Sequence, residues 1–133
     1  MSTPENTFIT SVHKHLPDKL YRMKNHNQYN GGIPDCWYSG DKADLWVEYK
    51  YRAIPARATT DMSPDLSALQ IEWLLNRHAE GRDVAVITGC ADGGVLTRVG
   101  ELWAMTAGQF RERMKNRREL AAMIASKCML FTT

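Results

Sequence analysis

The segment at residues 84–89, Val-Ala-Val-Ile-Thr-Gly, most constrains the fold, because it is a nearly continuous apolar run. Such a run is typical of a strand inside a sheet whose two faces are both covered by other elements. The chain has 133 residues, a length that suggests one domain and that can bury one core. We therefore expect a sheet with helices packed against its faces.

Helices are indicated where apolar residues recur every three to four positions behind a capping residue. Proline at the first helical position supports two of them, because an N–H at that position has no partner within the helix. A glycine after the second helix is typical of a C-terminal cap. The expected helices are 4–16, capped by Thr3 and stopped by Pro17; 64–80, capped by Ser63 and ended by Gly81; and 106–127, broken near Asn116.

Alternating or apolar runs predict the strands, and the Gly-Asp-Lys-Ala segment at 40–43 predicts a hairpin turn between two of them. The order α-β-β-β-α-β-β-α indicates an α/β fold with a mixed central β-sheet flanked by helices. We expect a single domain over residues 1–133, with a core at about 3–105 and a C-terminal helical tail at 106–133. The expected strands are 20–24, 35–39, 44–51, 84–89, 95–99 and a short one at 102–105.

Composition excludes several classes of protein. Hydrophobic residues make up 44% and charged residues 24% of the chain, which is ordinary for a globular protein and argues against disorder. No apolar run approaches the roughly 20 residues that cross a bilayer, and the polar N-terminal segment does not resemble a secretory signal. Cys36, Cys90 and Cys128 are odd in number and far apart, so we expect reduced thiols and no zinc site in a cytoplasmic protein.

The distribution of charge says more about partners than the net charge, which is only +2. Three basic residues without an acid lie within 49–60, and five basic residues with a single acid lie within 111–118. Such local clusters fit a phosphate-binding surface, although a solvated helix face explains one of them equally well. The candidate DNA-binding residues are Arg52, Arg57, Arg111, Arg113, Lys115, Arg117 and Arg118.

The predicted hairpin carries the residues that best fit catalysis. Glu48 and Lys50 are two positions apart on a strand, so their side chains leave the same face. A turn centred on 41–42 places Asp35 opposite Glu48, with Cβ atoms about 4.5–5.5 Å apart. Two carboxylates that close repel unless a cation lies between them, and oxygen ligands of this kind suit Mg²⁺. Lys50 would then stabilise negative charge developing on a scissile phosphate.

An ordinary hairpin with a solvated acidic and basic edge explains the same pattern. Against it, Glu48 and Lys50 lie inside an apolar strand, where two charges are unfavourable without partners. Core packing is the default role of the four tryptophans, and near the hairpin only Trp37 and Tyr38 could stack on a base. The four histidines have no metal-ligand spacing, and we expect them at the surface or near phosphate.

The Gly-Ile-Pro-Asp35 motif, followed by Glu48-Tyr-Lys50, resembles the PD-(D/E)XK nuclease superfamily. The segment 66–74, which contains Gln70, is similar to the helix after the catalytic hairpin in VRR-NUC nucleases and in archaeal and phage Holliday-junction resolvases. The resemblance spans roughly residues 5–99, and it implies a restriction-endonuclease-like core of the order αβββαβ.

The resemblance also implies a role for each of six residues. Two of these residues also have a simpler explanation. Gln70 could be a polar residue at the edge of an amphipathic helix, and the helix dipole alone favours an acid such as Glu5 in the first turn of a helix. In the implied roles, Asp35 and Glu48 bind Mg²⁺ or Mn²⁺ together with the backbone carbonyl of Tyr49, Lys50 is the catalytic lysine, Gln70 orients water or contacts phosphate, and Glu5 supplies an outer carboxylate.

We therefore expect a Mg²⁺-dependent DNA endonuclease that hydrolyses phosphodiester bonds and selects branched DNA, such as Holliday junctions, by shape in DNA repair or recombination. Symmetric cutting of a junction needs two sites, so a homodimer is the economical expectation. We expect the protein to act in the cytoplasm. If it is encoded by a phage, this is the cytoplasm of the host cell. Two alternatives stay open: a sequence-specific restriction or nicking endonuclease that reads bases with residues 25–32, and a nucleic-acid-binding module without catalysis.

Overall fold

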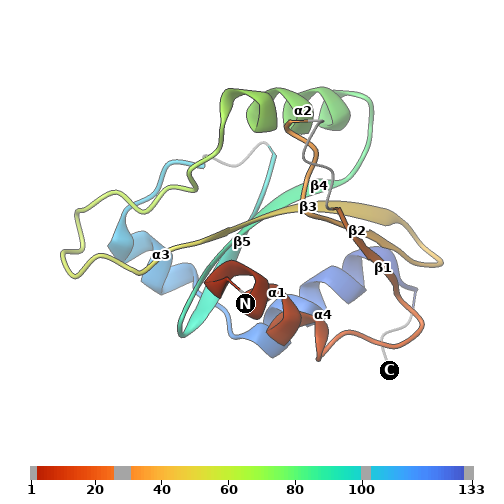
Figure 1. The fold of residues 1–133 in the computed structure, drawn as a ribbon, viewed down its shortest axis with the longest axis horizontal. Helices are drawn as coiled ribbons and strands as arrows, with labels where there is room; N and C mark the ends of the chain where they lie inside the picture. The colour runs from red at the N-terminus through yellow and green to blue at the C-terminus, as the bar shows by residue number, and fades with distance from the viewer. Residues whose placement is uncertain (1–2, 26–30, 100–102, 131–133) are drawn as a thin grey trace.

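The computed structural model describes residues 3–25, 31–99 and 103–130, which form a five-stranded sheet with helices on both faces (Figure 1). The strands lie in the order β1-β2-β3-β4-β5, and neighbours pair antiparallel except β3 and β4, which are parallel. The expected mixed sheet is therefore confirmed. Its elements are α1 (Pro4–His13), β1 (Tyr21–Lys24), β2 (Cys36–Ser39), β3 (Asp44–Tyr51), α2 (Ala68–Ala79), β4 (Val84–Cys90), β5 (Gly93–Arg98), α3 (Ala107–Arg113) and α4 (Arg117–Cys128).

The predicted hairpin register is also confirmed. Tyr38 on β2 lies opposite Leu45 on β3, and the ladder ends with Cys36 opposite Val47. Asp35 directly precedes β2, so the same register, continued by one pair, brings it opposite Glu48. Side chains alternate between the two faces of a strand, and hence β3 presents its even-numbered residues on one face and its odd-numbered residues on the other.

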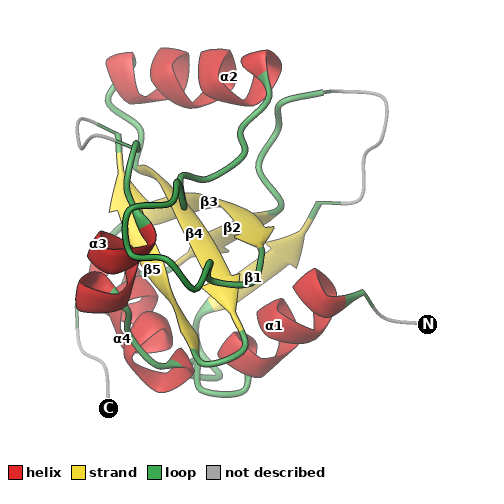
Figure 2. Cartoon of the chain, turned by 90° about the vertical axis from the view of Figure 1, so that its left-hand side faces the viewer, coloured by secondary structure: helices red, strands yellow, loops and turns green. Residues whose placement is uncertain are grey.

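One face of the sheet is covered by α1 and α4, which lie together on the side opposite α2 (Figure 2). Phe8 of α1 and Ile124 of α4 belong to the same buried cluster as Val47, Tyr49 and Ile87 of the sheet. The helical tail expected after residue 105 is therefore part of the main core, because α4, its second helix, is one of the two helices that cover this face.

The opposite face is covered by two smaller clusters. Leu74 of α2 packs against Val84 and Val86 of β4, whereas Phe110 of α3 packs with Cys90 and Val95. All seven residues of β4 are buried, as the apolar run predicted, because helices cover both of its faces.

The second helix begins four residues later than predicted. Ser67, not Ser63, is its N-cap, and Gln70 completes a capping box with it. The Ser63 hydroxyl is used elsewhere, since it donates to Asp61 and accepts the backbone N–H of Met105. Residues 64–67 therefore lead up to the helix instead of forming its first turn.

The remaining differences are at element ends. The first helix ends at His13, and a short turn of backbone hydrogen bonds replaces its predicted last residues. Residues 103–105 form no strand, and the rest of the predicted strand, residue 102, lies outside the described residues. The predicted break near Asn116 is confirmed, because Asn116 caps α4.

The cysteines Cys36, Cys90 and Cys128 are buried and form no disulfide bond, as expected. In the described part of the chain, no helix has the length and apolar character needed to span a bilayer.

Candidate active site

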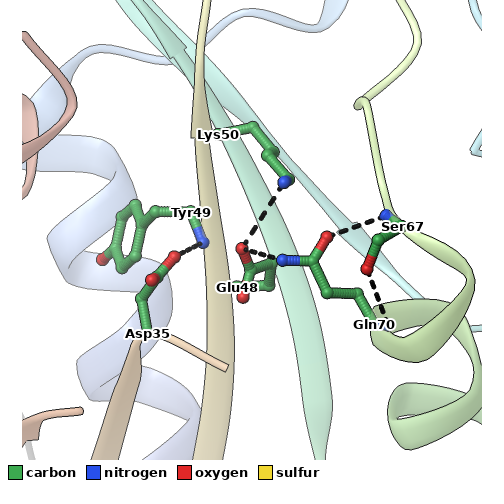
Figure 3. Close-up of polar contacts among 6 residues, drawn as sticks. All are labelled: Asp35, Glu48, Tyr49, Lys50, Ser67 and Gln70. Atoms are coloured by element: carbon green, nitrogen blue, oxygen red, sulfur yellow. Dashed lines mark hydrogen bonds and ion pairs between the residues drawn. The ribbon is translucent and has the colours of Figure 1, made fainter. Parts of the chain in front are cut away.

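The face of β3 that looks toward α2 carries the predicted catalytic residues. Glu48 and Lys50 project from this face toward Gln70 in the first turn of α2, and the ring of Tyr49 projects from the opposite face (Figure 3). Asp35 approaches β3 from the start of β2, where its Oδ2 accepts the backbone N–H of Tyr49 at 2.8 Å. The structure thus brings together the hairpin residues and the glutamine that sequence motifs selected.

Glu48 is the central residue of this group. Its side chain is almost completely buried, with 3% of the residue exposed. Its Oε2 accepts a hydrogen bond from the Gln70 amide at 3.0 Å and lies 3.8 Å from the Lys50 ammonium. Its Oε1 is buried, and no donor within residues 3–25, 31–99 and 103–130 forms a hydrogen bond to it. A solvated hairpin edge does not describe this carboxylate, because a buried oxygen without a donor is unfavourable.

The surroundings of Glu48 disfavour its charged form. Burial raises the pKa of Glu48 to about 8, with a further contribution from the nearby charge of Asp35, and Lys50 opposes the rise. The pKa of Glu5 on α1 is also raised, first by burial and then by Asp35. The Glu5, Asp35 and Glu48 carboxyl groups therefore raise one another's cost of ionisation, and a positive charge beside Glu48 would favour its charged form.

Gln70 is fixed in orientation by the cap of its own helix. Its Oε1 accepts the backbone N–H of Ser67 at 2.9 Å, while its backbone N–H donates to the Ser67 hydroxyl. The amide nitrogen is thereby directed at Glu48. The Ser67-x-x-Gln70 spacing of a capping box is readable in the sequence, and it is the signal that would have placed this helix start correctly.

A surface cavity of about 530 Å³ opens beside Lys50. The Arg52 guanidinium lies at its wall and donates to the backbone carbonyl of Ser63 at 3.3 Å, so it also holds the loop after β3. The cavity has a volume within the range of ligand pockets, and its charged lining combines three carboxylates with two basic side chains. It is lined by Glu5, Lys50, Tyr51, Arg52, Asp61, Ser63, Pro64 and Asp65.

Among residues 3–25, 31–99 and 103–130, no group of three or more His, Cys, Asp or Glu side chains is placed to hold a metal ion. The donors at hand are the Asp35 and Glu48 carboxylates, and the free Glu48 Oε1 is the atom that most needs a positive partner. Hard oxygen donors of this kind suit Mg²⁺, which keeps several waters and needs few protein ligands. The donor chemistry thus fits such an ion with two carboxylates, and the Tyr49 carbonyl remains a predicted third ligand.

Arg117 has a structural role that sequence reasoning missed. Its Nε donates to the Ser11 hydroxyl at 2.6 Å, and its terminal nitrogens donate to the carbonyls of Ala91 and Cys90. Its guanidinium also lies over the Phe8 ring, 4.9 Å from the centroid. Because these contacts tie α4 to α1 and to the turn after β4, we remove Arg117 from the expected phosphate contacts.

The other predicted DNA contacts lie on the surface near the loop after β3 or on α3 and the start of α4. Arg57, Lys115 and Arg118 are exposed, and Arg113 is half-buried. Arg111 is exposed and donates to the carbonyl of Pro55 at 2.7 Å, which links α3 to the loop. These residues remain predicted phosphate contacts.

The structure changes the predictions for Tyr38, expected to be able to stack on a base, and for His13, expected at the surface. Tyr38 is fully buried and therefore does not stack on a base. Its hydroxyl is hydrogen-bonded to the Tyr49 hydroxyl at 2.7 Å and to His13 Nε2 at 2.8 Å. His13 is half-buried and is held by its contact with the Tyr38 hydroxyl, and burial lowers its pKa to about 4.

No family model and no curated protein matches the chain. The structure is similar to that of Hjc from Archaeoglobus fulgidus, described as a Holliday junction resolvase from an archaeal hyperthermophile. The TM-score is 0.55, and the match covers 88% of this chain and 99% of that chain. The likeness establishes the fold. With 15% sequence identity, it confirms the mixed sheet flanked by helices, and the assignment of chemistry depends on the site itself.

The raised pKa of Glu48 predicts how stability depends on pH in the absence of divalent ions. A carboxyl group whose pKa is higher in the folded than in the unfolded state stabilises the fold below about 4.5, and this contribution is lost as pH rises through about 8. We expect the free energy of unfolding to fall between pH 7 and 8.5, by up to about 1.4 kcal/mol per pH unit. Urea denaturation in EDTA measures it.

The same series on Glu48→Gln is the matched control, and its free energy of unfolding should fall less steeply in this window than that of the wild type. The decrease that remains comes from Cys36 and Cys128, because burial raises the pKa of both thiols and they stay protonated in the folded state while the unfolded thiols begin to ionise. His13 does not interfere, because its lowered pKa costs stability only as pH falls from 6.5 toward about 4. Equal pH dependence in the wild type and Glu48→Gln would show that Glu48 is not the titrating group.

Proposed function

We propose that the protein is a metal-dependent DNA endonuclease that hydrolyses phosphodiester bonds in branched DNA. The observation that carries this proposal is the buried Glu48 carboxylate. Its Oε1 receives no hydrogen bond from any donor in the described part of the chain, while Asp35 lies close by and Lys50 is 3.8 Å from Oε2. Such a group destabilises a protein without a ligand, so it points to a bound cation and thus to function.

Each residue of the site has its own role in the proposed reaction. Asp35 and Glu48 would hold Mg²⁺ or Mn²⁺ with the Tyr49 carbonyl, and a bound ion supplies positive charge to phosphate oxygens and favours ionisation of an attacking water. Lys50 would place its ammonium beside the scissile phosphate and stabilise the charge that develops there. Gln70 holds Glu48 Oε2 in place, and Glu5 borders the same cavity as Lys50.

Selection of branched DNA is supported by the fold shared with the archaeal Holliday junction resolvase. A homodimer would provide the two sites that symmetric cutting of a junction needs. A role in DNA repair or recombination follows from that substrate. The closer VRR-NUC assignment, a phage origin and a cytoplasmic location remain predictions.

One cleavage assay tests the proposal. Linear duplex, single strand, flap and four-way junction are each incubated with Mg²⁺, Mn²⁺ or EDTA. We expect cleavage of branched substrates with either ion and none in EDTA. Cleavage that persists in EDTA, or cleavage that follows the sequence of the arms when these are scrambled, would contradict the proposal.

Phosphate contact by the exposed arginines predicts a uniform effect on DNA binding. Arg57→Ala and Arg118→Ala should weaken binding to all sequences alike and lower the slope of log affinity against log salt concentration by about one unit each, because one counterion fewer is released. Titrations at several salt concentrations measure this slope.

Arg117→Ala is the informative counterpart on the same helix as Arg118. It should lower the melting temperature, because it removes the contacts to Ser11 and to the carbonyls after β4. The salt slope should stay unchanged. If Arg117→Ala changes the slope and Arg118→Ala does not, the assignment of these two residues is reversed.

A further inference from the structure

A row of aromatic rings crosses the sheet on the face that carries the candidate active site. Tyr21 of β1 packs edge-on against Trp37 of β2, with ring centroids 5.4 Å apart. Trp37 stacks on Trp46 of β3 at 5.9 Å, and Trp46 contacts Trp73 of α2 at 5.3 Å. We call these four residues the aromatic row.

The aromatic row continues the candidate active site along two elements at once. On β3, Trp46 precedes Glu48 by two residues, so it shares the same face about 7 Å away. On α2, Trp73 follows Gln70 by about one helical turn. Gln70 of α2 contacts Glu48 of β3, and Trp73 of α2 contacts Trp46 of β3. The candidate active site and the aromatic row therefore lie next to each other between the same strand and the same helix.

The aromatic row is accessible, unlike a core cluster. Tyr21 is 56% exposed, and the three tryptophans are only half-buried. The tryptophans border a surface cavity of about 340 Å³, which is at the lower end of the range for ligand pockets. The cavity is lined by Trp37, Asp44, Trp46, Trp73, Arg77 and Arg82.

Charge around this cavity favours an anionic ligand. Arg77 lies 5.7 Å from the centroid of the Trp73 ring and also pairs with Glu80, whereas Arg82 is exposed. The one acid that lines the cavity, Asp44, is engaged in holding the platform, since its carboxylate accepts the Trp37 indole N–H at 3.1 Å. Flat apolar rings with arginines at their rim suit a nucleotide, which has an aromatic base and a phosphate.

We propose that the aromatic row binds unpaired bases of the DNA beside the cleavage position. This inference rests on the proposed function and narrows its substrate to branched DNA with unpaired nucleotides at the branch. A paired and stacked base does not offer its face to a protein ring, so stacking on the row distinguishes unpaired from paired DNA. It does so with little preference for sequence, because every base has an aromatic face.

A second copy of the chain is the other occupant that an exposed aromatic surface could accept. Bases are favoured because the row is continuous with the candidate active site and because arginines border it. A DNA strand that extends from the Glu48 and Gln70 contact along α2 passes over these rings.

The test measures binding in EDTA, where cleavage does not contribute. A labelled four-way junction with two unpaired nucleotides at the branch is compared with a fully paired junction, for the wild type, Trp37→Leu and Tyr21→Leu. We expect each substitution to weaken binding of the unpaired junction at least fivefold and to leave the paired junction unchanged. Leu75→Ala removes an apolar side chain that is 47% exposed on α2 outside the row, and it should change neither.

Tyr21 lies on the exposed edge strand, so Tyr21→Leu provides the test even if Trp37→Leu lowers stability. Quenching of tryptophan fluorescence by a short oligothymidine gives an independent measurement on the wild-type protein, and we expect it to saturate. Equal loss of affinity for both junctions, no loss for either, or absence of quenching would overturn the inference. A shift of the row variants from dimer to monomer in gel filtration, with DNA binding intact, would assign the row to contact between copies instead.

The two proposals can fail separately. If the wild type binds the unpaired junction through the row but does not cut it with Mg²⁺ or Mn²⁺, the endonuclease proposal fails and the binding role stands. If the wild type cuts branched DNA and the row variants bind both junctions normally, only the role of the row fails.

Discussion

Replacement of Glu48 by glutamine is expected to reduce the cleavage rate by more than about 10³-fold, beyond the loss of a single electrostatic donor. The amide carries no charge to neutralise a divalent ion, and the remaining carboxylate of Asp35 balances only half of the ion's charge. Mn²⁺ binding measured by calorimetry should disappear together with activity. Because the raised pKa of Glu48 reports an unfavourable charged state, the same variant should be more stable than the wild type in EDTA at pH 8.

This pair of opposite changes is the distinguishing result. If Glu48 had only a structural role, its replacement would make the protein less stable, because the hydrogen bond with Gln70 would be weakened. Asp35→Asn is a second test of the same site, and it keeps an oxygen that can accept the backbone N–H of Tyr49. Undiminished Mn²⁺ binding by the variant that combines Asp35→Asn and Glu48→Gln would exclude these two carboxylates as the metal site.

Replacement of Lys50 by alanine is expected to lower turnover by about 10²-fold to 10³-fold with little change in DNA affinity. Its ammonium lies 3.8 Å from Glu48 Oε2 and borders the cavity beside the site, where the proposed hydrolysis would develop negative charge on the phosphate. Single-turnover cleavage and equilibrium binding in EDTA separate the two effects. Lys50→Arg, which keeps the charge but changes its geometry, should recover part of the rate.

Lys50 also opposes the rise in the pKa of Glu48. Lys50→Ala should therefore shift the pH dependence of Mn²⁺ binding toward higher pH, because the carboxyl group then holds its proton more tightly. Lys19→Ala, an exposed lysine outside the site, is the matched control and should leave rate and pH profile unchanged. Normal cleavage by Lys50→Ala would show that the lysine is not catalytic.

Local pattern in the sequence was sufficient for the five strands of the sheet and for the hairpin, although it also predicted a short strand at 102–105 that residues 103–105 do not form. The apolar run that became β4 and the short turn between β2 and β3 depend on neighbouring residues, so strand positions and the register of Tyr38 with Leu45 followed directly. The same register brought Asp35 to the β3 backbone beside Glu48. The family resemblance implied a role at the site for Gln70, but its hydrogen bond to Glu48, 22 residues away in the sequence, is seen only in the structure.

Competing local signals explain the misplaced start of α2. Ser63-Pro64 and the Ser67-x-x-Gln70 box are both acceptable helix starts. The backbone N–H of Met105 decides between them, since it binds the Ser63 hydroxyl from a segment 42 residues away. No local pattern contains that contact.

The sequence by itself showed that Glu48 and Lys50 are charged residues within an otherwise apolar strand, and it therefore indicated where a catalytic site is expected. Only the tertiary structure decided that Glu48 Oε1 is buried without a hydrogen-bond donor among the described residues, that Arg117 binds groups inside the protein, and that Trp73 completes the aromatic row. These outcomes depend on how α2 and α4 pack on the sheet. Helix packing is set by the fit of many side chains at once, and a short motif does not encode it.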